Sequence, residues 1–152
     1  MKIMWCKTLI IISKRLRNIK KIPWDMEEMV ALVDLYYRYE NGMISNLSKE
    51  LYNLSKCLIN RADLLMITHD EKYRNVNGIN MIFQNIRYVD TNGKTGLSSA
   101  SQLVYDVVNL YRTDRKQFNQ ILNQFNFKID CQVKCNTIRE KNFEAPRRES
   151  EN

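Results

Sequence analysis

Apolar residues recur at intervals of three and four along most of this chain, which is the spacing of one face of an α-helix. The pattern runs in five stretches between residues 24 and 126, and short polar segments separate them. Only four glycines and two prolines occur in 152 residues, so sharp turns are few. The sequence therefore predicts an all-α fold, a bundle of about five helices.

Capping residues indicate where these helices begin and end. Asp25 and Glu28 form a capping-box pair at the first helix, and Asn41-Gly42 ends it. Asn75 is the expected N-cap of the third helix. The last helix is expected to end near Asn126. We expect one core that contains Trp24, Leu32, Phe83, Ile86, Val107, Tyr111 and Leu122.

The net charge of +7 is concentrated at the N-terminal end of the chain. Residues 1–22 hold seven basic side chains and no acidic one, which leaves 17 of the 24 basic residues to balance 17 acidic residues elsewhere. We therefore expect a basic N-terminal arm over residues 1–22 and a neutral helical domain over 23–126. Residues 127–152 read as a polar, disordered tail, or as a linker to a domain missing from this chain.

The sequence favours no membrane, metal or cofactor role. The apolar run Leu9–Ile12 is too short for a signal peptide or a membrane span, so we expect a cytoplasmic protein. The four cysteines include no Cys-x-x-Cys pair and His69 is the single histidine, which favours reduced thiols over a zinc site. No nucleophile or metal-binding carboxylate has a recognisable partner, so we expect a non-enzyme with no cofactor.

The segment "RNVNGINMIFQNIRYV" is unusually rich in amides for a helix. Ile79, Ile82, Phe83 and Ile86 share one side, and polar residues share the other. Asparagine and glutamine can pair with adenine and arginine with guanine, so this polar side could read the major groove of DNA. The alternative is that the amides are merely solvated. The candidate DNA-binding residues are Arg74, Asn77, Asn80, Met81, Gln84, Arg87 and Tyr88, with Lys14, Arg15, Arg17, Lys20 and Lys21 of the arm adding phosphate contacts.

Four stretches carry a resemblance to a known family: "PWDMEEMVALVDLYYR", "LSKELYNLSKCLINRA", "EKYRNVNGINMIFQNIRYV" and "GKTGLSSASQLVYDVVNLYRTDRKQF". They resemble the helical, Myb/SANT-like head module at the N-terminus of bacterial restriction and phage-defence proteins, including McrA-like HNH endonucleases and helicase-type defence proteins. The most specific pieces are Trp24 with Glu27-Glu28, the block from Arg74 to Ile79, and Gly96-Leu97.

The resemblance implies a Myb-like or helix-turn-helix-derived bundle with the third helix in the recognition position. The implied function is a non-catalytic targeting or accessory module that binds double-stranded DNA in a phage-defence or restriction system. The rival prediction is a protein-interaction adaptor that recruits a separate effector protein. Its candidate contact residues are Tyr36, Tyr37, Tyr39, Tyr52 and Tyr88, and the alternative for these rings is ordinary packing in the core and at its boundary. The sequence assigns no oligomeric state.

Overall fold

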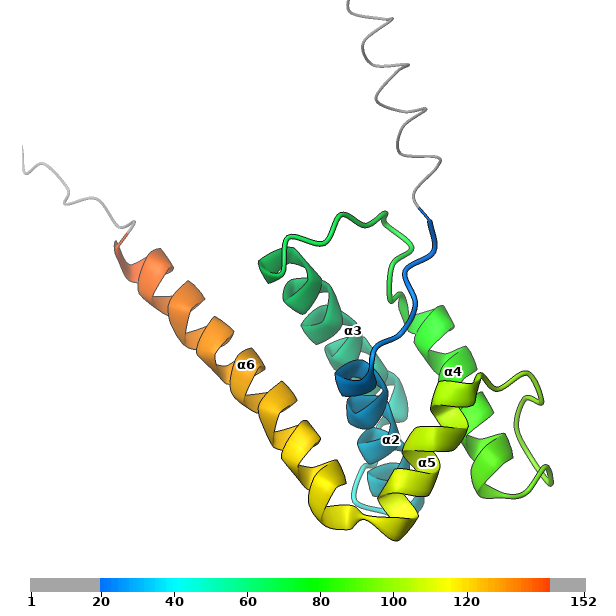
Figure 1. Ribbon diagram of the computed structural model, residues 1–152. Coiled ribbons are helices and arrows are strands. Elements are labelled where there is room, and N and C mark those ends of the chain that lie inside the picture. The colour runs from blue at the N-terminus through cyan, green and yellow to red at the C-terminus, as the bar shows by residue number, and fades with distance from the viewer. Residues whose placement is uncertain (1–19, 143–152) are drawn as a thin grey trace, which may run out of the picture.

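Five helices make up the described part of the chain, and no strand occurs there (Figure 1). The computed structural model describes residues 20–142, with side chains through residue 130. The helices are α2 (Met26–Glu40), α3 (Leu47–Leu64), α4 (Val76–Asp90), α5 (Gln102–Thr113) and α6 (Arg115–Asn142). The predicted all-α bundle of about five helices is confirmed.

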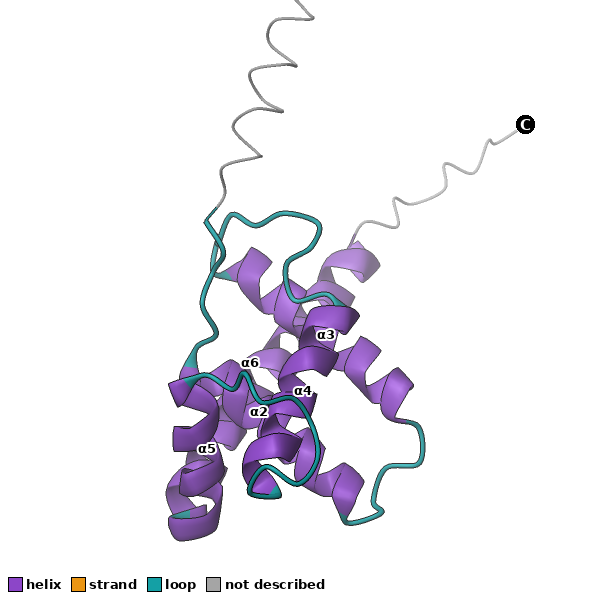
Figure 2. Cartoon of the chain, turned by 90° about the vertical axis from the view of Figure 1, so that its right-hand side faces the viewer, coloured by secondary structure: helices purple, strands orange, loops and turns teal. Residues whose placement is uncertain are grey.

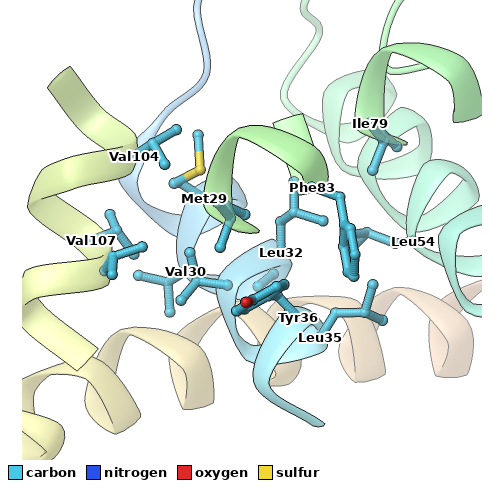
Figure 3. Close-up of a cluster of buried hydrophobic side chains, with 14 of the residues drawn as sticks. Met29, Val30, Leu32, Leu35, Tyr36, Leu54, Ile79, Phe83, Val104 and Val107 are labelled. Carbon is cyan, nitrogen blue, oxygen red and sulfur yellow. The ribbon is translucent and has the colours of Figure 1, made fainter. Parts of the chain in front are cut away.

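Helix α2 is the centre of the bundle. It packs against each of the other four helices, and most of its residues between Glu28 and Tyr36 are buried. Figure 3 shows side chains of α3, α4 and α5 pointing at it from several directions. A helix with apolar residues on nearly all sides belongs in the middle of a fold, because only there are all of its faces covered.

The predicted core is confirmed, with some of its members at the edge. Leu32, Phe83, Ile86 and Val107 are fully buried in one cluster. Trp24, Tyr111 and Leu122 are partly buried and pack against the same cluster. Amphipathic rings commonly take such boundary positions, because one end is apolar and the other can remain in water.

The expected helix starts are also observed. Asp25 Oδ1 accepts from the Glu28 backbone N–H at 2.9 Å, and Glu28 Oε2 accepts from the Asp25 backbone N–H at 3.1 Å. These two bonds form the predicted capping box. Asn75 Oδ1 accepts from the Gly78 N–H at 2.8 Å, which confirms Asn75 as the N-cap of α4.

The predicted end of the last helix near Asn126 is wrong. Helix α6 continues to Asn142, so residues 127–142 are helical where a disordered tail was expected. No glycine or proline interrupts this stretch, and Ile129 continues the apolar stripe against the core. The expected disorder of residues 143–152 falls outside the described residues.

The loop between α4 and α5 folds back against α4, and Figure 2 shows it crossing in front of that helix. The Leu97 N–H donates to the Gln84 carbonyl at 3.0 Å, and Gly93 lies against the Tyr88 ring. Gly96 has a φ of +94°, and a Cβ there would lie 2.3 Å from the Gln84 oxygen. Only glycine fits this position, because both the backbone conformation and the space exclude a side chain.

We predict that Gly96→Ala destabilises the protein by about 3 kcal/mol, because strain and a backbone clash combine. The matched control is Gly42→Ala, which has a φ of +72° but no atom within 4 Å of the new Cβ. It should cost about 1 kcal/mol, from backbone strain alone. Urea unfolding measures both values. Equal losses in the two variants would show that the loop does not pack tightly on α4.

Candidate nucleic-acid interface

Arg74 is a structural residue, and the prediction that it lies on the exposed side of the third helix is wrong. Its side chain is 6% exposed and forms a two-pronged ion pair with Glu28, which is 1% exposed. Arg74 Nη2 lies 2.7 Å from Glu28 Oε2, and Nε lies 3.1 Å from Oε1. A guanidinium enclosed in this way cannot reach a DNA base.

The same arginine fixes the chain that leads into α2. Arg74 Nη1 and Nη2 donate to the carbonyls of Ile22 and Pro23 at 3.1 and 2.8 Å. The Tyr73 hydroxyl donates to Glu28 Oε1, and Ser55 Oγ donates to the Arg74 carbonyl. We call Glu28, Tyr73 and Arg74 the buried clamp. It ties the chain before α2, α2 itself, α3 and the start of α4 together.

Burial and the nearby Glu28 carboxylate raise the pKa of Tyr73 to about 12. Its hydroxyl therefore stays protonated and remains a donor to Glu28 at any ordinary pH.

The exposed part of α4 is its N-terminal half. Asn77 and Asn80 are exposed, and Met81 is 58% exposed. Gln84 and Tyr88 are only half-exposed, where the α4–α5 loop covers them. The predicted DNA-binding face of α4 is therefore accessible only in its N-terminal half, because the protein's own loop covers the C-terminal half.

Arg87 already binds side chains of the protein itself. Its Nη2 lies 2.8 Å from Glu40 Oε1, and its Nη1 lies 3.4 Å from Gln84 Oε1. The ion pair with Glu40 raises the pKa of Arg87, so its charge is permanent but already matched. Arg87 is therefore a poor candidate for binding a base or a phosphate.

A cleft of about 340 Å³ lies beside the N-terminal half of α4. We call it the α4 cleft, and its lining includes Lys20, Lys21, Trp24, His69, Lys72 and Met81. It joins residues that are far apart in the sequence, from the end of the basic arm, the connection before α4, and α4 itself. Lys20, Lys21 and Lys72 are all exposed. Lys14, Arg15 and Arg17 of the predicted site lie outside the described residues.

Lys72 is the functional candidate that sequence reasoning missed. It lies in the segment "ITHDEKYR", which reads only as a connection between helices. No local signal identifies it, because Lys72 meets Lys20, Lys21 and Met81 only in the folded chain.

One wall of the α4 cleft is a stack of planar groups. The rings of His69 and Tyr73 lie 4.7 Å apart, and the Arg74 guanidinium lies 4.5 Å from the Tyr73 ring. The same guanidinium lies 4.6 Å from the Trp24 ring. All four residues line the cleft, and the buried clamp holds the two in the middle.

His69 ends this stack and has two acceptors. Its Nε2 lies 2.7 Å from Asp63 Oδ1, and its Nδ1 lies 3.1 Å from the Asp70 carbonyl. Only the protonated imidazole can donate to both. The Asp70 carbonyl and the Asp63 carboxylate therefore raise the pKa of His69.

The tyrosines of the rival adaptor prediction are mostly packing residues. Tyr36 is buried, Tyr37 stacks on Tyr111 with centroids 3.7 Å apart, and Tyr39 packs on Phe83. Only Tyr52 of the five is strongly exposed, at 51%. The core alternative is thus the better description of these residues.

Asp90 explains why two of these tyrosines cluster. It accepts from the hydroxyls of Tyr36 and Tyr37 at 2.9 and 2.7 Å and pairs with Arg112 at 2.7 Å. Burial alone would raise the pKa of Asp90, but these hydrogen bonds and the Arg112 charge outweigh it and lower the pKa. Burial and Asp90 together raise the pKa of both tyrosines. This cluster joins α2, α4 and α5.

Neither a metal centre nor a membrane segment is found in the part of the chain that the structure describes. No three histidine, cysteine or acidic side chains gather there closely enough to hold a metal ion. No helix within these residues has the length and apolar character needed to cross a membrane.

Comparison with protein-family models, with curated proteins and with solved structures finds no match for this chain. The resemblance to the Myb/SANT-like head module therefore stays a prediction. The residues that carry it do have physical roles here. Glu28 and Arg74 belong to the buried clamp, Trp24 lies against Arg74, and Gly96-Leu97 packs on α4.

We predict that Arg74→Ala destabilises the protein by about 3–5 kcal/mol, because it leaves the buried Glu28 carboxylate with only a long ion-pair contact, to Arg61 at 4.0 Å. The control Arg87→Ala breaks a partly exposed pair and should cost less than about 1 kcal/mol. Urea unfolding measures both. If Arg74→Ala folds as stably as the parent and loses DNA affinity instead, the original assignment of Arg74 was correct.

The raised pKa of His69 predicts a pH-dependent stability. A group whose folded pKa exceeds its unfolded value, about 6.5 for histidine, adds stability that is complete below that pH. That stability is lost as the pH rises through the folded pKa. The parent should therefore lose more stability than His69→Gln between pH 5.5 and about 8, as followed by urea unfolding at each pH. Parallel profiles would show that the two acceptors do not hold a proton on His69.

Proposed function

We propose that this chain binds double-stranded DNA through the N-terminal half of α4, without catalysing a reaction. The observation that carries the proposal is the exposure of Asn77, Asn80 and Met81, together with the position of Met81 in the lining of the α4 cleft, which also contains three lysines. In helix-turn-helix proteins, the N-terminal residues of the recognition helix contact the base edges. This half of α4 is also the half that the protein's own loop leaves uncovered.

The exposed side chains suit base recognition. An asparagine amide can donate to and accept from one adenine, and an apolar side chain such as Met81 can lie against a thymine methyl group. Asn77 and Asn80 are three residues apart and therefore lie on one face of the helix. A preference for A·T-containing sites follows from this proposal.

The phosphate contacts are assigned to the basic arm and to the cleft lysines. The remainder of the chain has no net charge, so most of the nonspecific attraction to DNA comes from residues 1–22. Lys20 and Lys21 lie at the point where this arm meets the α4 cleft. Affinity from the arm and sequence preference from α4 are thus separable in this proposal.

The architecture departs from a compact helix-turn-helix. Residues 65–75 connect α3 to α4, whereas that motif uses a turn of three or four residues. A Myb-like or helix-turn-helix derivation therefore rests on the sequence resemblance. The setting in a bacterial phage-defence or restriction system rests on that resemblance as well.

One observation favours the adaptor function as a second candidate. A groove of about 340 Å³ runs between α6 and the α2–α3 pair, with Leu54, Leu122 and Phe125 in its lining. Phe127, which follows on α6, is 70% exposed. An amphipathic helix of a separate effector protein is the kind of partner that such a groove accepts.

We predict that Asn77→Ala and Asn80→Ala melt like the parent protein, because both side chains are exposed. Each should weaken discrimination at one base position by about 1–3 kcal/mol while leaving overall affinity largely unchanged. Selection from a randomised duplex pool measures the preference, and thermal melting checks the fold.

The matched control is Asn123→Ala, another exposed asparagine in the interior of a helix, on α6. It should change neither the melting temperature nor the base preference. The DNA proposal is wrong if the parent binds no duplex at low salt. It is also wrong if Asn77→Ala and Asn80→Ala both select the same sequences as the parent, as the control should.

A further inference from the structure

We propose that the α4 cleft binds one unpaired nucleotide of a nucleic acid, with the base on its stacked wall and the phosphate beside its lysines. The inference builds on the proposed DNA-binding function. It goes further because contact between α4 and a duplex needs no cleft.

The size of the cleft selects a single nucleotide over a duplex. Its volume of about 340 Å³ is at the lower end of the range for small-ligand sites. A DNA duplex has a major groove that alone is about 12 Å wide, so it can lie across the mouth of the cleft but cannot enter it. A nucleotide that has left the stack, at a strand end or an overhang, can enter.

The chemistry of the wall suits a nucleobase. Bases stack on aromatic rings and on guanidinium planes, and such stacking tolerates any base. The wall already contains a stack of His69, Tyr73, Arg74 and Trp24, with 4.5–4.7 Å between successive groups. A base can continue this arrangement only on its end groups, His69 and Trp24, which are partly exposed, because Tyr73 and Arg74 are buried between them.

The wall is also rigid before a ligand arrives. Tyr73 and Arg74 both bond to the buried Glu28 carboxylate, and Arg74 additionally bonds to two backbone carbonyls. A preorganised surface loses little conformational entropy on binding, so more of the stacking energy appears as affinity.

The charge of the cleft suits a phosphate. Lys20, Lys21 and Lys72 form no ion pair with any residue that the structure describes. Asp70 is the acidic residue in the lining, and its Oδ1 accepts from the Lys72 backbone N–H at 2.9 Å. Because Glu28 neutralises Arg74, the three lysines against one aspartate leave the cleft positively charged.

Met81 connects the cleft to the duplex-binding surface. It lines the cleft and belongs to the exposed half of α4 that carries Asn77 and Asn80. A duplex bound on α4 close to one of its ends therefore brings that end beside the cleft. This arrangement favours a DNA end with an overhang over a continuous duplex.

The test compares three fluorescein-labelled DNA probes at low salt: a blunt duplex, the same duplex with a three-nucleotide single-stranded overhang, and a single strand of equal length. We expect the overhang duplex to bind about tenfold more tightly than the blunt duplex. An overhang that carries 2-aminopurine should lose fluorescence on binding, because its base becomes stacked on the wall. Charge attraction alone would not cause that loss.

Two variants separate the cleft from the duplex surface. Lys72→Glu should abolish the tenfold gain, whereas Lys94→Glu, the same charge change in the α4–α5 loop, should retain it. Asn77→Ala should keep the gain while it alters base preference in the duplex. Melting curves confirm that each variant is folded, and Lys72 is exposed, so its replacement should not disturb the core.

The outcomes are distinct. Equal affinity for blunt and overhang duplexes, or an unchanged 2-aminopurine signal, overturns the cleft proposal and leaves duplex binding standing. Binding of the single strand without any binding of the blunt duplex overturns the proposed function and supports the cleft. If the protein binds none of the three probes, both the cleft proposal and the proposed function are wrong.

Discussion

The ion pair between Glu28 and Arg74 is the interaction on which the rest of this structure depends. Burying two charges is costly, and the cost is offset only when geometry and further hydrogen bonds satisfy both groups. Here the Glu28 carboxylate accepts from two Arg74 nitrogens, from the Tyr73 hydroxyl and from the Asp25 N–H. Arg74 uses two further donors on the backbone carbonyls of residues 22 and 23. The pair thereby fixes the entry to α2, the start of α4 and the wall of the α4 cleft in a single arrangement.

The helices and their core could be predicted because their signal is local. Leu51, Leu54 and Leu58 lie on one stripe in any α-helix, whatever the rest of the chain does, and burial of that stripe follows from the hydrophobic effect. The role of Arg74 could not be read in this way. Its partner is 46 residues away, and an arginine beside a polar helix face has the same pattern whether it faces solvent or a buried carboxylate. The end of α6 was missed because its apolar stripe fades gradually after Phe125, with no residue that stops a helix.

The candidate site shows the same limit. Exposure of Asn77 and Asn80 follows from helical periodicity, and the structure bears it out. Half-burial of Gln84 and Tyr88 depends on the path of the next loop, which Gly96 sets through a backbone conformation that its neighbours in the sequence do not reveal. The α4 cleft has no sequence signature, because Lys20, Lys72 and Met81 come together only in the folded chain. Local pattern thus predicts which residues face outward, and tertiary contacts decide which of those remain accessible.

The clamp also gives the proposed division of labour a structural basis. A chain whose excess positive charge lies in one arm could direct that charge anywhere around a neutral domain. Arg74 fixes the C-terminal end of the arm, since it bonds to residues 22 and 23 while its own backbone leads directly into Asn75, the N-cap of α4. The end of the arm therefore lies beside the first turns of α4, with Lys20, Lys21 and Met81 lining the same cleft. Electrostatic attraction is independent of sequence, whereas amide contacts depend on it. In the proposed function, an arm that attracts any DNA would thereby bring each segment to the end of α4 that distinguishes one sequence from another.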